Sequence, residues 1–109
     1  MPLGKTPAER YALRLRSACE KLDKSEPSLD FVGKVERVTG HGGKLGPGYE
    51  FSIYAASSSE RGIRNADGGI AFVHVSDDGF VTIDLDEPEG QRFPEPLLEC
   101  VVRRAEILR

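Results

Sequence analysis

The stretch that most constrains the fold is residues 69–87, GIAFVHVSDDGFVTIDLDE, in which a short polar turn separates two runs rich in Val, Ile and Phe. Gly79 predicts a β-hairpin here, because glycine readily adopts the positive φ that closes a short loop. A two-residue loop would mix apolar and acidic side chains on both faces, whereas a three-residue loop over 77–79 makes one face wholly aliphatic. The predicted pairs on that face are Val75 with Val81, Val73 with Ile83, and Ala71 with Leu85.

The opposite face of this hairpin carries aromatic and acidic side chains. An antiparallel sheet commonly buries one face and exposes the other, so we expect this face to remain uncovered. Exposed rings supply contact area and carboxylates supply orientation, a composition typical of protein-contact surfaces. Two alternatives stay open: the rings lie beneath the loop over 57–68, or they pack in a homodimer. The predicted partner-binding residues are Phe72, His74, Asp77, Asp78, Phe80, Asp84 and Asp86.

The composition predicts one domain over residues 1–109. A chain of 109 residues with 39% hydrophobic and 30% charged residues can bury a single core without disulfides or metals. The sequence has no apolar run of transmembrane length and no secretory signal, so we expect a cytoplasmic protein without a membrane partner. In that compartment Cys19 and Cys100 are expected to be free thiols. No metal-ligand spacing is present, and we expect no cofactor.

Helices are predicted at both ends of the chain. Residues 6–9, Thr-Pro-Ala-Glu, have the form of a capping box that begins a helix, and Pro27 stops that helix. Pro94 or Pro96 suits the first turn of a last helix, which carries an apolar stripe.

Four strands are predicted between these helices. Residues 28–39 predict a strand with an irregularity near Gly33 or Glu36, and residues 49–56 alternate cleanly enough to predict a second strand. The two strands of the hairpin follow. We therefore predict an α+β two-layer sandwich, in which a four-stranded antiparallel sheet carries both terminal helices on one face, in the order α-β-β-β-β-α.

Catalytic chemistry is only weakly indicated. In the predicted register His74 faces Thr82, with Asp84 diagonal to it and close enough for a hydrogen bond, so the two could act as a general acid–base pair. The sequence indicates no nucleophile or substrate pocket beside that pair. Cys19 falls in the apolar stripe of the first helix, where a buried thiol is expected. We therefore predict that the protein is not an enzyme.

Charge is unevenly distributed along the chain. The net charge is −3, but residues 1–64 contain eleven Lys or Arg against eight Asp or Glu, whereas residues 65–109 contain four against ten. The basic part supports an alternative, a small nucleic-acid-associated or regulatory protein that uses Arg10, Arg14 and Arg16 on the first helix. No aromatic residue shares that helix face, and the chain is acidic overall, so nucleic acid is not the expected partner.

The hairpin sequence, with its Val-Ser-Asp-Asp-Gly-Phe turn followed by Ile-Asp-Leu-Asp, resembles the central hairpin of small bacterial immunity proteins of the TriTu type. The resemblance covers this hairpin alone, and the chain lacks the Trp that often precedes the turn in that family. It implies a protein that neutralises a toxin by stoichiometric binding. An acidic edge would suit the basic groove of a nuclease. We therefore predict a non-enzymatic protein-binding module, an inhibitor or immunity protein, that uses the aromatic and acidic face of the hairpin.

Overall fold

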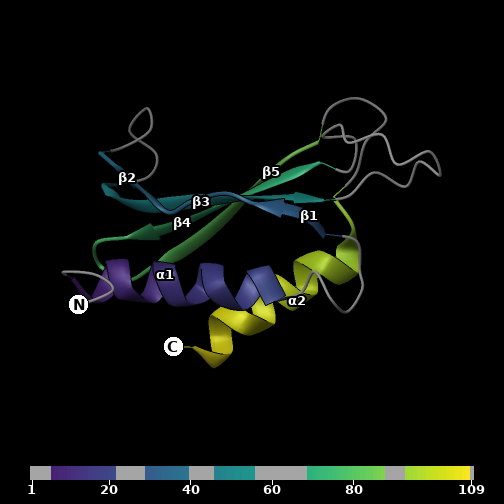
Figure 1. Ribbon diagram of the computed structural model, residues 1–109. Helices are drawn as coiled ribbons and strands as arrows, with labels where there is room; N and C mark the ends of the chain where they lie inside the picture. The colour runs from purple at the N-terminus through teal and green to yellow at the C-terminus, as the bar shows by residue number, and fades with distance from the viewer. Residues whose placement is uncertain (1–5, 22–28, 40–45, 56–68, 88–92, 109) are drawn as a thin grey trace.

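The computed structural model describes residues 6–21, 29–39, 46–55, 69–87 and 93–108, and these residues form two helices and a five-stranded antiparallel sheet. Across the sheet the strands follow the order β1-β3-β4-β5, and β2 also pairs with β3. Both helices lie against one face of the sheet, which confirms the predicted α+β two-layer sandwich (Figure 1). The elements are α1 (Pro7–Glu20), β1 (Leu29–Val32), β2 (Glu36–Val38), β3 (Gly48–Ala55), β4 (Ile70–Ser76), β5 (Val81–Asp86) and α2 (Glu95–Ile107).

Both helices begin where the sequence predicts. The Oγ1 of Thr6 accepts a hydrogen bond of 3.1 Å from the backbone N–H of Glu9, which caps α1. In α2 the N-cap is Pro94, and Pro96 lies in the first turn, where the missing N–H costs no helical hydrogen bond. A side-chain cap therefore marks the start of α1, whereas proline marks that of α2 without a side-chain capping hydrogen bond.

The end of α1 differs from the prediction. The described helix stops at Glu20, before the expected stop at Pro27, and residues 22–28 lie outside the described residues. The N–H of Lys21 donates to the carbonyl of Ala18, three residues back, which tightens the last turn and ends the α-helical pattern.

The strand predicted over 28–39 is in fact two strands, so the sheet has five strands instead of four. β1 and β2 pair with opposite ends of β3, and residues 33–35 between them are not in a strand. Arg16 on α1 stabilises this break, because its Nε donates to the carbonyl of Gly33 at 2.9 Å and its Nη2 to that of Val32 at 3.0 Å. The helix thereby satisfies carbonyls that no other described strand reaches. The irregularity predicted near Gly33 is confirmed as this break.

The register of the central hairpin is confirmed. Residues 77–79 form the loop, and Gly79 has a φ of +91°. The N–H of Ser76 donates to the carbonyl of Phe80 at 2.9 Å, and the N–H of Gly79 donates to the carbonyl of Ser76 at 2.8 Å. The observed pairs include Val75 with Val81, Val73 with Ile83, and Ala71 with Leu85.

The core lies between the aliphatic face of the sheet and the two helices. Ala71, Val73 and Val75 have no exposed surface, as the register predicts. A side-chain hydrogen bond joins the two helices below them, in which the hydroxyl of Tyr11 donates to the carbonyl of Ala105 at 2.6 Å. The largest fully buried apolar side chains are Phe51, Leu15, Ile53 and Leu97.

Candidate functional site: the open face of the sheet

The face of the sheet that carries no helix is the candidate interaction surface, and we call it the open face (Figure 1). Side chains alternate between the two faces of a strand, so every second residue of β3, β4 and β5 contributes. Across the sheet Phe72 lies opposite Asp84, and His74 lies between Glu50 on β3 and Thr82 on β5. The open face comprises Phe31, Glu50, Ser52, Tyr54, Ile70, Phe72, His74, Ser76, Phe80, Thr82, Asp84 and Asp86.

A hollow of about 500 Å³ lies beside the hairpin turn. Phe80 lines it and is 68% exposed, which makes it the most exposed large apolar side chain among the described residues. Asp78 adds an exposed carboxylate to the lining. The apolar surfaces of Pro47 and Phe80 beside a carboxylate suit the long stem and cationic head of an Arg or Lys side chain. The lining includes Pro47, His74, Ser76, Asp78, Phe80 and Thr82.

His74 belongs to the open face but is only 2% exposed. Neither of its ring nitrogens has a hydrogen-bond partner among the described residues, so the predicted hydrogen bond to Asp84 is wrong. The nearest carboxylate belongs to Glu50, whose Oε2 lies 3.8 Å from Nδ1 of His74. Glu50 is directly opposite His74 in the β3–β4 ladder, whereas Asp84 is diagonal to it and opposite Phe72. Cross-strand neighbours that face each other directly approach more closely than diagonal ones.

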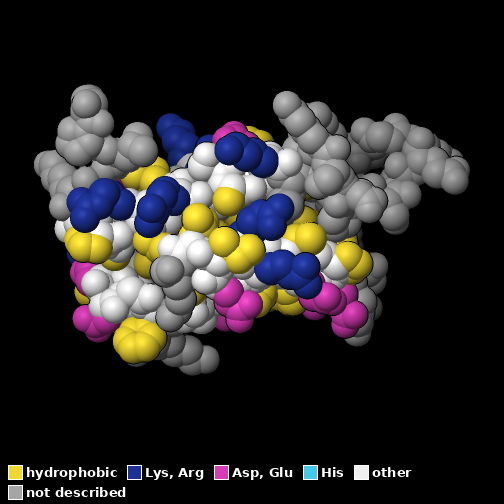
Figure 2. Space-filling model, turned by 90° about the horizontal axis from the view of Figure 1, so that it is seen from below, with side chains coloured by type: hydrophobic (Ala, Val, Ile, Leu, Met, Phe, Trp, Pro, Cys, Tyr) yellow, Lys and Arg dark blue, Asp and Glu magenta, His cyan; other side chains and the backbone are white. Residues whose placement is uncertain are grey.

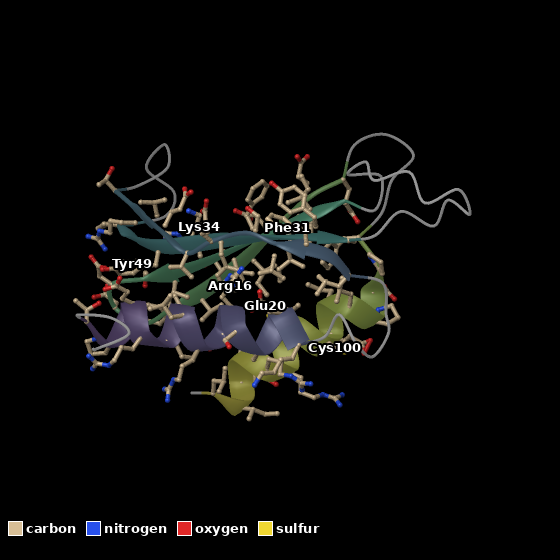
Figure 3. The ribbon with its side chains drawn as sticks, in the orientation of Figure 1. Arg16, Glu20, Phe31, Lys34, Tyr49 and Cys100 are labelled. Carbon is tan, nitrogen blue, oxygen red and sulfur yellow. The ribbon has the colours of Figure 1, made fainter. Side chains whose placement is uncertain are left out.

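Two aromatic residues of the open face were not among the predicted contact residues. Phe31 is 57% exposed, and its ring centroid lies 5.7 Å from that of Tyr54 on β3. Strict alternation would place Phe31 on the same face as the buried Leu29. A β-bulge between these two residues reverses the alternation, so Phe31 points away from the helices (Figure 3). The broken alternation of the β1 sequence is the signal that could have located it.

The predicted contact residue Asp77 is held in an ion pair. The guanidinium of Arg37 on β2 donates to both carboxylate oxygens of Asp77, at 2.6 and 3.1 Å, and lies over the ring of Tyr49 at 5.0 Å from its centroid. The hydrogen bond from Arg37 lowers the pKa of Asp77. This pair ties β2 to the hairpin turn, whereas Asp78, Asp84, Asp86 and, on β2, Glu36 remain as exposed carboxylates on or beside the open face.

The three arginines of the alternative basic face on α1 do not share one exposed surface. Arg10 and Arg14 are exposed. Arg16 instead points toward β1, where it makes the two backbone hydrogen bonds described above, and its Nη1 lies 3.2 Å from Oε1 of Glu20 (Figure 3). Figure 2 shows the helix side of the molecule, where Lys and Arg side chains are separated by uncharged atoms and most Asp and Glu side chains lie in the lower half of the view. The three predicted arginines therefore do not form one basic surface.

Cys19 lies in the core with no exposed surface. Burial raises the pKa of its thiol from 9.0 to about 12, and the nearby charge of Arg104 opposes this only in part. A thiol that stays protonated at neutral pH is a poor nucleophile. Cys19 and the half-buried Cys100 are both free, as predicted.

Among the described residues, no group of His, Cys, Asp or Glu side chains has the arrangement needed to hold a metal ion. Neither described helix combines the length and the apolar character needed to cross a bilayer. No protein-family model, curated protein or solved structure matches this chain.

Proposed function

We propose that this chain is a non-enzymatic protein-binding module that holds its partner on the open face, as an inhibitor or immunity protein would. The observation that carries the proposal is the exposed ring of Phe80 beside a hollow that Asp78 and His74 line, on a face that neither helix covers. A ring at the mouth of a hollow, with carboxylates around it, is suited to anchor and orient a partner.

The exposed rings can supply the binding energy. Phe80 is 68% exposed and Phe31 is 57% exposed. Removing a phenylalanine side chain completely from water contributes about 1.5–3 kcal/mol, so two such rings support a specific contact if a partner covers them. Aromatic residues near the centre of an interface commonly carry most of its binding energy.

The charges of the open face favour a basic partner. Asp84 and Asp86 on β5 and Asp78 in the turn are exposed carboxylates, and the exposed Glu36 on β2 lies opposite Glu50 of the same face. Carboxylates arranged in this way can occupy a groove that otherwise binds phosphates, which is how the resemblance to immunity proteins would be realised in a toxin complex.

The experiment that tests this proposal measures partner binding by open-face variants. The tagged chain is cross-linked and purified from its native cells, and the dissociation constant of the recovered partner is then measured by calorimetry. We expect Phe80→Ala and Phe31→Ala each to weaken binding by about thirtyfold, as loss of a hot-spot ring does. Ile107→Ala is the matched control, because this side chain is 66% exposed but belongs to α2.

The same measurement separates the proposal from the alternative. Equal affinity of the wild-type chain and both ring variants would contradict binding on the open face. If Arg10→Gln with Arg14→Gln instead removes a salt-sensitive association with nucleic acid, the basic-helix alternative is correct.

A further inference from the structure

The outer edge of β5 has no strand partner among the described residues, because the sheet order ends at this strand. β5 is six residues long, and it contains no Pro, Lys or bulge of the kind that commonly blocks an exposed edge. The edge formed by β1 is interrupted, because β1 carries a bulge. In addition, Arg16 donates hydrogen bonds to the carbonyls of Val32 and Gly33. β5 is therefore the edge that presents a regular row of backbone donors and acceptors.

The hydrogen bonds of the hairpin determine which backbone groups of β5 point outward. The N–H of Ser76 donates to the carbonyl of Phe80, so these two residues form a hydrogen-bonded pair. Hydrogen-bonded and non-hydrogen-bonded pairs alternate along an antiparallel ladder, so Thr82 is the next β5 residue bonded to β4. The residues whose backbone N–H and C=O point away from the sheet are then Val81, Ile83 and Leu85.

The side chains of the same three residues form an incompletely covered apolar row on the helix side. Val81 and Ile83 are half-buried and Leu85 is 40% exposed. Val81 and Ile83 also line a hollow of about 420 Å³ between β5 and α2, together with Val102, which is 39% exposed, Ala105 and the exposed Glu106. A strand added beside β5 would bury this apolar row while it satisfied the backbone edge.

We propose that two copies of this chain pair antiparallel through β5, about a two-fold axis at Ile83, to form one continuous sheet. In this register the outward backbone groups of Ile83 bond to Ile83 of the second copy. Those of Val81 bond to Leu85 of the second copy, and those of Leu85 to Val81. All three outward residues are used, and their side chains form one aliphatic row across the axis.

The charges of β5 are compatible with this register, which is the one that uses all three outward residues. With the axis at Ile83, Thr82 lies opposite Asp84 of the second copy, and Phe80 lies opposite Asp86. No carboxylate then faces another carboxylate. Shifting the axis to Asp84 would place the two Asp84 carboxylates opposite each other, which is destabilising.

The pairing leaves the open face uncovered. The two-fold axis is perpendicular to the continuous sheet, so the helices of both copies lie on the same side and the two open faces lie side by side on the other. Partner binding and self-association can therefore be tested independently.

Sedimentation velocity of the full chain over a concentration series tests the dimer. We expect a monomer–dimer equilibrium in the micromolar range, because the paired surface is small. Leu85→Lys places a charge in the aliphatic row and should make the chain monomeric, whereas Phe31→Lys at the opposite edge should leave the equilibrium unchanged. A wild-type chain that is monomeric at every concentration would overturn the proposal, and so would a dimer that Phe31→Lys dissociates and Leu85→Lys does not.

A charge change at Thr82 tests the register while it keeps the core intact. Thr82→Lys should tighten the dimer by about two- to thirtyfold, because each copy then gains a Lys–Asp84 pair, and Thr82→Asp should weaken it by a similar factor. Equal dimerisation by the two variants would contradict the axis at Ile83. Amide hydrogen exchange is a second readout, because Val81, Ile83 and Leu85 should be slowed only in the dimer, whereas Thr82 should be slowed in both states.

Discussion

Burial keeps the thiol of Cys19 protonated, and this has a measurable consequence at the scale of a single residue. Cys19 has no exposed surface and a pKa of about 12, whereas Cys100 is half-buried. At pH 8 we expect a thiol reagent to label Cys100 first and Cys19 only after denaturant is added, because a buried neutral thiol reacts slowly. Mass spectrometry of tryptic peptides measures the order. Labelling of Cys19 in the native protein before Cys100 would contradict the buried position.

The raised pKa of Cys19 also determines the direction in which the stability of the fold changes with pH. The pKa of Cys19 is raised in the folded chain above its ordinary value of 9.0, so the folded state holds the proton more tightly than the unfolded state does. Its contribution to stability is therefore fully present below pH 9 and is lost as the pH rises toward 12. The control variant Cys19→Ala should lose less stability over that range.

Individual contact residues could be predicted where the register alone decides their position. Phe72 and Asp84 are opposite each other, as the aliphatic pairing on the other face requires. Phe31 could not be placed in this way, because its direction depends on a bulge. The pairing of Asp77 with Arg37 was also not predictable, because it joins residues forty positions apart on two different elements.

At the scale of elements, one helix side chain holds the break between β1 and β2. Arg16 reaches two carbonyls of this segment, and its side chain is 25% exposed. We expect Arg16→Met to lower the free energy of unfolding by about 1–3 kcal/mol, because it keeps the apolar stem but leaves two carbonyls without their charged donor. Urea denaturation measures the loss. Arg14→Met is the matched control on the same helix, where the side chain is exposed, and an equal loss in both variants would contradict the role of Arg16.

The elements themselves differ in how far local sequence determines them. The hairpin could be predicted with its register, because its turn and both strands are contiguous and alternate regularly. The two helices could be located by their first turns for the same reason. The split of the 28–39 segment could not be predicted, because Arg16 and the two ends of β3 act on it from distant parts of the chain.

At the scale of the whole molecule, the acidic open face should govern how fast a basic partner arrives. Replacing Asp78, Asp84 and Asp86 with Asn should slow association and flatten its dependence on salt, because long-range attraction raises the association rate at low ionic strength. Stopped-flow association rates over a salt series measure this effect. The charge-matched control replaces Glu95, Glu99 and Glu106 with Gln, which are exposed on α2. An equal effect of both triple variants would mean that net charge alone steers the partner.

The hydrogen bond from the Tyr11 hydroxyl to the Ala105 carbonyl joins positions 94 residues apart in the chain. During translation, the first helix emerges long before the residue that receives this bond has been made. The helix layer can therefore close over the sheet only after Ala105 has left the ribosome. Until then the two helices do not fully cover the aliphatic face of the nascent sheet. A chaperone that recognises apolar segments would bind the chain best in that interval.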